Sequence, residues 1–255
     1  QEHDEQSLLD IALDTRVEMM DAWHQRFTEA LQSLDGGNAG RARNLNRDWN
    51  GTAAADSRSY VMVQAFREVV EDALLSPLVA PVAEAMEVYQ SKFPAREEAV
   101  EAILRTRPLH LLPLPHDTWE AFLSDCAEKT IQVLIQKGGP NALSKRWGEK
   151  NSPRVAHPIA NQLPPIFDGL VRLPDPPQSG SMDAVKVIRP GFGASLRMVI
   201  SPSNHEGAIY HMPGGQSGDP RSDQYRKGHN AWIKGKPTLM RSGAAVRTIR
   251  LKPAG

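Results

Sequence analysis

The chain has few features of metal, disulfide, membrane or nucleic-acid chemistry. Its 255 residues include one cysteine, which excludes an intrachain disulfide and a thiolate metal site. No run of about 18 apolar residues occurs, so we expect no membrane span. The 30 basic and 30 acidic residues cancel, whereas a dedicated nucleic-acid-binding protein is expected to carry a positive excess. These absences indicate an ordinary globular protein with enough residues for a sizeable hydrophobic core.

Two local features qualify this picture. The single cysteine, Cys126, lies in a stretch that reads as helix, which predicts a buried structural thiol rather than a nucleophile. The chain starts at Gln1 with neither a methionine nor a signal-like segment, and its first six residues are polar. We expect this end to result from processing upstream or from cutting a longer chain.

Glycine and proline divide the sequence into two regions. Only four of the 19 glycines precede residue 138, and eight of the 20 prolines lie between residues 153 and 190. Residues 1–150 are therefore predicted to be helical, and residues 151–255 to form an extended arm followed by antiparallel strands. The predicted fold class is α+β.

The helical region shows clear periodicity. One helix is predicted from an apolar stripe, and Asp35-Gly36-Gly37 should end it. The stripe consists of Leu9, Leu13, Met20, Trp23, Phe27, Leu31 and Leu34. A second should follow candidate caps at Asp56-Ser57 and end near Ser76-Pro77, with Tyr60, Val63, Phe66, Val70 and Leu74 on one face. A third is predicted over residues 94–105, and a fourth from about residue 117 to the Gly138-Gly139-Pro140 stop.

The second region contains strand-like runs. Residues 184–188 and 246–251 are predicted to be short strands, and a short helix is expected within residues 219–232. Leu196, Met198 and Ile200 alternate with Arg197 and Val199, and residues 208–212 follow a polar loop at 201–207. These two runs predict an antiparallel pair.

The most conspicuous motif is Gly214-Gly215-Gln216-Ser217-Gly218, between Pro213 and Asp219-Pro220. A nucleophile elbow needs a small residue two positions after the serine, where this chain has Asp219. A chymotrypsin-like serine would need strands upstream, where this chain is helical. We interpret the block as a structural turn, with glycines that permit positive φ and with Gln216 and Ser217 bonding to backbone; a catalytic Ser217 is the alternative.

Other candidate residues indicate no metal site. Prolines separate His110 from His116 and Asp117, which prevents them from sharing a helical face, and no ligand spacing appears. His205 and His211 flank the predicted hairpin and could meet across it, but capping or solvated roles are expected for all these histidines.

The C-terminal stretch is basic and would suit an anionic partner, although no interleaved aromatic residues support nucleic-acid binding. A solvated face, or one that pairs with acids of the helical region, is the simpler expectation. The cations are Arg221, Arg226, Lys227, Lys234, Lys236, Arg241, Arg247, Arg250 and Lys252.

Several blocks together resemble a known family. Residues 195–200 precede Met212-Pro213 and the glycine block, and Pro220-Arg221-Ser222, Tyr225, Trp232 and Gly235 follow in order. Upstream lie Arg146-Trp147-Gly148-Glu149 with His157-Pro158, Asp48-Trp49-Asn50-Gly51 before Asp56-Ser57, and residues 9–15. In this order the blocks resemble the C-terminal part of the large chain of penicillin amidases (penicillin acylases), over nearly the whole sequence. Arg226-Lys227, where members often carry two acids, and Asn50, where Asp is usual, depart from the family pattern.

The resemblance implies an N-terminal-nucleophile hydrolase with an αββα core shared between a small and a large chain. The precursor cuts itself and exposes a serine whose own α-amino group acts as base. That serine, the oxyanion-hole Asn and the calcium-binding acids align upstream of this sequence, and the amide of Gln1 cannot replace the serine. We therefore assign no catalytic residue, metal ligand or cofactor to this segment, and we expect a calcium site upstream.

The predicted function is the C-terminal segment of a hydrolase that cleaves the amide bond of an acylated small molecule, such as a penicillin or an acyl-homoserine lactone. This segment alone is predicted to be inactive. Its expected partners are the missing part of the large chain and the small chain, and the family suggests a periplasmic or secreted enzyme. The alternative is a non-catalytic interaction module that uses the basic C-terminal face.

Overall fold

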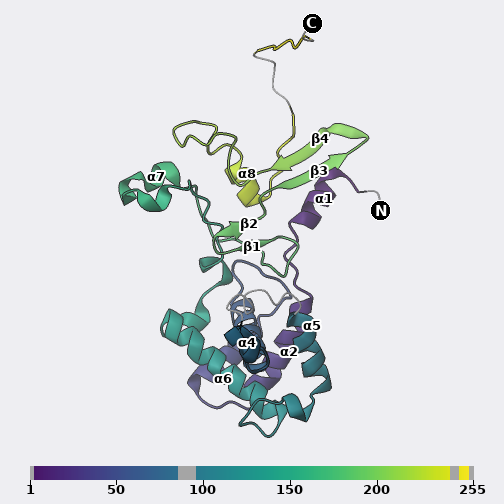
Figure 1. Ribbon diagram of the computed structural model, residues 1–255, viewed down its shortest axis with the longest axis vertical. Helices are drawn as coiled ribbons and strands as arrows, with labels where there is room; N and C mark the ends of the chain where they lie inside the picture. The colour runs from purple at the N-terminus through teal and green to yellow at the C-terminus, as the bar shows by residue number, and fades with distance from the viewer. Residues whose placement is uncertain (1–2, 86–95, 242–246, 253–255) are drawn as a thin grey trace. The chain divides into compact units, whose positions relative to one another are not determined.

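The computed structural model describes residues 3–85, 96–241 and 247–252 (Figure 1). Its class is α+β, as predicted, with long helices in the first half and a hairpin of antiparallel strands in the second. The chain forms two compact units, each considered by itself below. The helical unit comprises Thr15–Ser152 and Pro176–Pro190, and the strand unit comprises Gln1–Asp14, Pro153–Asp175 and Gly191–Gly255. The sequence division at residue 150 stays a prediction.

The helical unit is built on three helices that pack against one another, α2 (Met19–Gln32), α4 (Ser59–Ala85) and α6 (Trp119–Gly138). Around them lie α3 (Gly37–Asn46), α5 (Arg96–Thr106), short 3-10 turns at Leu109–Leu111, Ala142–Ser144 and Trp147–Glu149, and strand β1 (Ile188–Arg189). The aromatic rings of Trp23, Phe27 and Phe66 meet at its centre, with Phe27 and Phe66 centroids 4.9 Å apart. Burial of these large rings supplies much of the apolar stabilisation.

The first predicted helix is wrong as a single element. The stripe divides into α1 (Glu5–Ala12) and α2, and residues between them adopt extended backbone that pairs Thr15 and Val17 with Gly51 and Ala53. These backbone bonds replace the helical ones, so the interruption leaves its polar groups satisfied. The glycine pair does not end α2, because Gly36 is instead the residue that precedes α3.

The second predicted helix begins as expected but continues past its predicted end. Ser57 Oγ accepts a hydrogen bond from the Tyr60 N–H at 3.1 Å, which confirms the cap, and all five stripe residues are buried. The prediction that it ends near Ser76-Pro77 is wrong, since α4 contains both Pro77 and Pro81. Each proline removes one helical hydrogen bond, and the remaining bonds continue the helix around it.

The other two helical predictions are confirmed within the described residues. Helix α5 covers residues 96–106, and the predicted start at Pro94 lies outside the described residues. Helix α6 starts after Thr118, whose hydroxyl accepts from the Ala121 N–H, and ends at Gly138 with Gly139 at φ +80°. Positive φ is accessible to glycine at little cost, which favours a glycine at this helix end.

A buried ion cluster connects the helices of this unit. Arg67 on α4 lies 2.8 Å from Glu71 Oε1, 2.8 Å from Glu97 Oε2 on α5 and 3.0 Å from Asp183 Oδ1. Glu71 is 2% exposed, and burial raises the pKa of its carboxyl although Arg67 lies beside it. The indole N–H of Trp23 on α2 donates to Glu97 Oε1 at 2.8 Å. One guanidinium thus joins three acids from separate parts of the sequence.

The segment 176–190 is held to the helices by side-chain hydrogen bonds to its backbone. The Asn151 amide donates to the carbonyl oxygens of Gln178 and Gly180, and the Trp147 indole donates to the same Gly180 oxygen at 2.8 Å. A Cβ on Gly180, which has φ +111°, would lie 2.3 Å from the Lys186 carbonyl oxygen. This close turn therefore requires glycine.

The strand unit centres on the predicted hairpin, which is confirmed. Strands β3 (Arg197–Ser201) and β4 (Asn204–His211) pair antiparallel, with Arg197 opposite His211 and Val199 opposite Ile209. The predicted polar loop is shorter than expected because residues 204–207 already belong to β4. Helix α1 packs on this hairpin, where Leu9 joins Val199 and Ile209 in a small core with Leu13 beside it (Figure 1).

Other strand predictions hold only in part. Of residues 184–188, only Ile188 is in a strand, and residues 247–251 form no strand; Val246 lies outside the described residues. Alternating apolar residues become a strand only when a neighbouring strand satisfies their backbone, and none pairs with residues 247–251 in the part that the structure describes. The arm contains 3-10 turns at Ala160–Gln162 and Pro165–Phe167 and a short helix α7 (Asp168–Val171).

The remaining elements of the strand unit are β2 (Phe192–Gly193) and α8 (His229–Lys234), the latter within the region where a short helix was expected. Among the described residues, no helix combines the length and the apolar character that crossing a membrane requires.

The ion cluster predicts a large effect for Arg67→Leu. The change removes the closest cation of the buried Glu71 carboxylate, a kind of loss that typically costs about 3–5 kcal/mol of unfolding free energy. Because Arg96 stays 3.1 Å from Glu71 Oε2, we expect a cost near the lower end of this range, about 3 kcal/mol. Arg105→Leu, an exposed site in the last turn of α5, should stay within about 0.5 kcal/mol. Urea unfolding followed by tryptophan fluorescence measures both. Equal midpoints for the two variants would contradict the role given to Arg67.

Candidate functional site

The glycine block follows β4 in the strand unit and is held by a close backbone approach. The Gly215 N–H donates to the Tyr225 carbonyl oxygen at 2.9 Å. A Cβ built on Gly215 would lie 1.6 Å from the Gln224 carbonyl oxygen, closer than any real contact. The two segments can approach only because residue 215 has no side chain.

The prediction that these glycines are needed for positive φ is wrong. The glycines with positive φ are elsewhere in the described chain, and Gly214, Gly215 and Gly218 are not among them. Gly218 has no atom within 4 Å of the position that a Cβ would occupy. The block therefore depends on the missing side chain at Gly215 and not on left-handed backbone.

Ser217 has the contacts of a turn residue. Its Oγ accepts a hydrogen bond from the Asp219 N–H at 3.1 Å, and Asp219 in turn pairs with Arg221 at 2.9 Å. The Arg221 guanidinium lowers the pKa of the Asp219 carboxyl to about 2. No hydrogen bond joins Ser217 to an imidazole or carboxylate in the described part of the chain. Nucleophilic activation of a serine requires such a base.

A buried histidine, which the sequence analysis missed, holds the segment before the block. The His229 ring has Nδ1 2.5 Å from the Pro213 carbonyl oxygen and Nε2 2.7 Å from that of Pro174. Both ring nitrogens therefore face backbone carbonyl oxygens, which fixes the orientation of the ring. Nearby, the Tyr225 hydroxyl donates to the Val171 carbonyl oxygen at 2.8 Å. Tyr225 and Trp232, both buried, are thus structural residues around the block.

The alternating apolar side chains of β3 suggest a buried face, but the structure places them on the exposed face of the hairpin. Leu196, Met198 and Ile200 are exposed, with Met198 53% exposed, and Arg197 and Val199 are buried. Successive side chains of a strand point to opposite faces, and here α1 and Trp232 of α8 cover the face with Arg197 and Val199. The outer face of β3 is therefore apolar and open to water.

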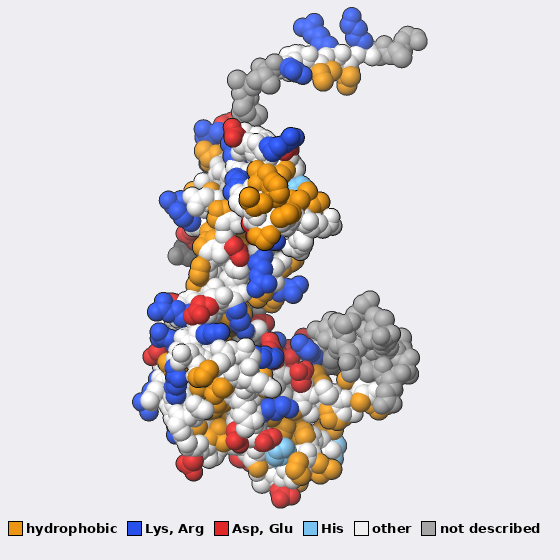
Figure 2. All heavy atoms as spheres, turned by 90° about the vertical axis from the view of Figure 1, so that its left-hand side faces the viewer, with side chains coloured by type: hydrophobic (Ala, Val, Ile, Leu, Met, Phe, Trp, Pro, Cys, Tyr) orange, Lys and Arg blue, Asp and Glu red, His pale blue; other side chains and the backbone are white. Residues whose placement is uncertain are grey.

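A second apolar surface lies on the arm. Ile166, Phe167 and Leu170, in and before α7, are exposed. Figure 2, which faces the side where α7 lies, shows hydrophobic side chains gathered in a patch at this level. Contiguous exposed apolar surface commonly marks an interaction site.

Arg197 is a buried cation without an acid. It is 6% exposed, its Nη1 donates to the Trp232 carbonyl oxygen at 3.0 Å, and its guanidinium lies 5.0 Å from the Trp232 ring centroid. Burial lowers its pKa to about 10, and its Nη2 has no hydrogen-bond partner in the described structure. Stacking on the indole compensates part of the lost hydration.

The histidines proposed as possible neighbours do not assemble a metal site. His205 and His211 lie six residues apart on β4, so they do not meet across the hairpin. His211 is buried, and its Nε2 is 2.6 Å from the Lys236 carbonyl oxygen. Within the described residues, no group of three or more His, Cys, Asp or Glu is placed to hold a metal ion.

His116 forms local contacts in the helical unit. Its Nδ1 is 2.8 Å from the Pro113 carbonyl oxygen, and its Nε2 is 3.4 Å from Asp125 Oδ2. His110 and His116 line the same pocket, and Asp117 is not among its lining residues. Cys126 is buried, as predicted, and burial raises the pKa of its thiol to about 12.

Three basic residues of the C-terminal stretch have partners inside the strand unit. Arg221 pairs with Asp219, and Arg241 lies 3.4 Å from Glu206. Arg226 donates to the carbonyl oxygens of Gly169 and Leu170. All nine cations of this stretch are exposed, which agrees with the expectation of a solvated face.

Two hydroxyl–imidazole pairs occur elsewhere. Ser7 Oγ lies 3.4 Å from His3 Nδ1, and Thr28 Oγ1 lies 3.4 Å from His24 Nε2. In both pairs the hydroxyl hydrogen-bonds a backbone carbonyl oxygen at shorter distance, 2.9 Å for Ser7 and 2.8 Å for Thr28. The hydroxyl proton is thus directed away from the imidazole, and neither pair has the geometry of an activated nucleophile.

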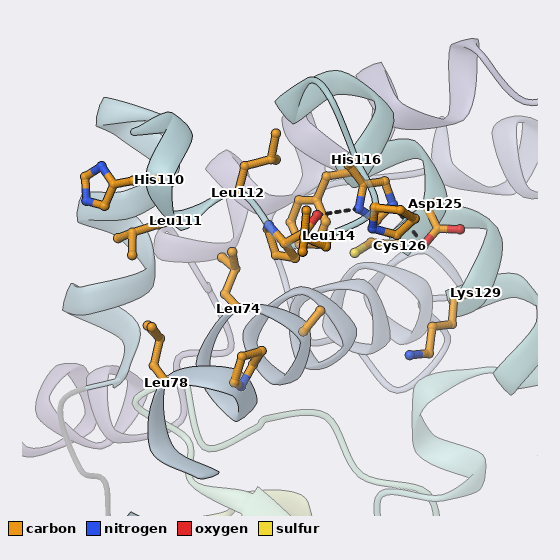
Figure 3. Close-up of a pocket in the computed structure, with 15 residues that line it drawn as sticks. Leu74, Leu78, His110, Leu111, Leu112, Leu114, His116, Asp125, Cys126 and Lys129 are labelled. Carbon is orange, nitrogen blue, oxygen red and sulfur yellow. Dashed lines mark hydrogen bonds and ion pairs between the residues drawn. The ribbon is translucent and has the colours of Figure 1, made fainter. Parts of the chain in front are cut away.

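The helical unit also has a pocket of about 550 Å³ beside Cys126 (Figure 3). Its walls come from α4, residues 110–116 and α6. Figure 3 shows leucine side chains around one space and the Lys129 side chain extending from α6 toward it. The lining is mostly apolar, as in small-molecule sites.

Comparison with protein families finds a match for this chain. The family model described as penicillin amidase matches residues 1–247, which cover the whole helical unit and all but the last eight residues of the strand unit. A search of curated proteins found no match. The matched region includes the glycine block, Tyr225 and Trp232, so the structural contacts above lie within the matched sequence.

We predict that Gly215→Ala is strongly destabilising and Gly218→Ala is not. The new Cβ at 215 would overlap the Gln224 carbonyl oxygen and force the two segments apart, which we expect to cost at least about 2 kcal/mol. Gly218→Ala meets open space and should change the unfolding free energy by less than about 1 kcal/mol. Thermal melts of both variants test this prediction. Similar decreases in melting temperature would show that the approach of residue 215 to Gln224 is unimportant.

We also predict that Cys126 reacts slowly in the folded chain. With a pKa near 12, the thiolate fraction at pH 8 is on the order of 10⁻⁴, against about a tenth for an ordinary thiol. Alkylation by iodoacetamide at pH 8, followed by mass spectrometry, should therefore accelerate about 1,000-fold or more when urea unfolds the protein. Fast labelling of the native chain would contradict the buried position of the thiol.

Proposed function

The chain belongs to the penicillin amidase family, and we propose that it is part of an enzyme that hydrolyses the amide bond of an acylated small molecule. The family match over residues 1–247 is the observation that carries this proposal. The substrate class we propose is a penicillin-like or acyl-homoserine-lactone-like amide. The enzyme is proposed to act in the periplasm or outside the cell, by family resemblance.

The nucleophile is proposed to lie outside these 255 residues. In the proposed mechanism, an N-terminal serine attacks the amide carbonyl while its own α-amino group takes the proton. The contacts of Ser217 support this location, because its Oγ accepts from backbone and has no base in the described structure. The hydroxyl groups of Ser7 and Thr28 are likewise directed to backbone oxygens.

This chain's own contribution is proposed to be structural. The close approach at Gly215, the His229 ring between two carbonyl oxygens and the Tyr225 hydroxyl bond hold the residues after β4 in one arrangement. A hydrolase that forms its core from several segments needs contacts that hold those segments in fixed positions. No described residues fit the family's calcium ion, so we place that site upstream and derive no step through it.

The partners are proposed to be the rest of the large chain and the small chain of the same precursor. The apolar outer face of β3 and the patch at α7 support this, because both expose side chains that another polypeptide would cover. The contacts of the C-terminal arginines with local acids and carbonyl oxygens speak against the alternative of a basic interaction module.

The test compares the complete enzyme with its Ser217→Ala variant. Chromogenic phenylacetyl, glutaryl and long-chain acyl amides should be hydrolysed by the complete enzyme and not by the 255-residue chain alone. Ser217→Ala should leave kcat unchanged and should lower stability by only about 0.5–1.5 kcal/mol, the value of one hydrogen bond.

Two results would refute the proposal. Turnover by the isolated chain that Ser217→Ala abolishes would make Ser217 the nucleophile. Absence of amide hydrolysis by the complete enzyme on all acyl classes would exclude the activity itself.

A further inference from the structure

We propose that the pocket beside Cys126 binds a small amphipathic carboxylate, an acid with an apolar body and one anionic head. Its volume of about 550 Å³ lies within the roughly 300–1,000 Å³ that small-molecule sites usually have. All lining residues belong to the helical unit, between residues 73 and 129. The site is separate from the glycine block, so this proposal does not depend on the proposed hydrolase activity.

Apolar side chains form the body of the pocket. Leu74 and Leu78 come from α4 and Leu111 from the 3-10 turn, and Figure 3 shows their side chains directed toward one space. At the rim, Leu114 is 91% exposed. Covering such groups with an apolar ligand removes them from water, which is the main favourable term for binding of this kind.

The charges at the pocket favour an anionic head. The Lys129 side chain extends from α6 toward α4 (Figure 3), and no ion pair joins its ammonium to a carboxylate among the residues that the structure describes. Asp125, on the same helix, lies beside His116 Nε2 and is directed to that ring. Lys129 is thus a lining cation without a carboxylate partner among the described residues, and its ammonium can pair with the carboxylate of a ligand.

The floor of the pocket offers no competing charge. Cys126 contributes a thiol that burial keeps protonated, and Phe122 beside it is an apolar ring. His116 packs edge-to-face on Phe122, and its Nδ1 faces the Pro113 carbonyl oxygen. A carboxylate at Lys129 therefore meets no buried anion, and the chain of the ligand has apolar neighbours along its length.

Calorimetric titration of the 255-residue chain with decanoate, decan-1-ol and decylamine, each below its aggregation concentration, tests the proposal. Decanoate should bind more tightly than the alcohol by up to about fivefold, the range of an exposed ion pair, and decylamine should bind least. Lys129→Gln should abolish the preference for decanoate over the alcohol. Raising the salt concentration should reduce this preference too.

Two further variants make the outcome decisive. Lys137→Gln removes an exposed cation of the same helix outside the pocket and should leave the preference intact. Leu114→Gln changes an exposed rim residue without disturbing the core and should weaken decanoate and decanol alike. Equal affinity of the acid and the alcohol, equal effects of the two lysine variants, or no binding at all would overturn the proposal.

Discussion

The charge of Arg67 is the constraint on which the helical unit depends. A guanidinium placed among buried helices is strongly unfavourable unless acids lie within ion-pair distance. Glu71 comes from the next turn of α4, but Glu97 belongs to α5 and Asp183 to the segment 176–190. Helices α4 and α5 and the segment 176–190 must therefore meet at one point, although they are far apart in the sequence. The Trp23 indole adds α2 to the same cluster through Glu97.

The sequence predictions for the helical unit succeeded where a local pattern sets the structure and failed where distant residues set it. Helices with long stripes, such as α6, could be predicted because burial of one face follows the period of 3.6 residues. The break between α1 and α2 could not, because Leu9 and Met20 are eleven residues apart, which is close to three helical turns. The stripe therefore stays in phase across residues that are not helical. The ion cluster had no local signal beyond the i, i+4 spacing of Arg67 and Glu71.

The glycine block shows a different limit. Its position and its turn-like character could be read from composition, because glycine and proline interrupt regular structure. The need for glycine at position 215 could not be predicted, because it arises from the carbonyl oxygen of Gln224, which comes close only in the folded chain. His229 is similar, since a single histidine in sequence says nothing about two carbonyl oxygens contributed by Pro174 and Pro213. Composition located the block, and the contacts of Gly215 and His229 give its physical basis.

The strand unit is incomplete as a hydrophobic structure. Its small core joins Leu9 to Val199 and Ile209, yet the opposite face of β3 keeps Met198 and its neighbours in water. A two-stranded hairpin is marginally stable unless its faces are covered. Helix α1 covers one face only. The proposed function gives this imbalance a meaning, because the partners proposed above, the other parts of the precursor, would cover this apolar face. On that proposal, the exposed residues that leave the hairpin marginally stable by itself would be its contacts with those partners.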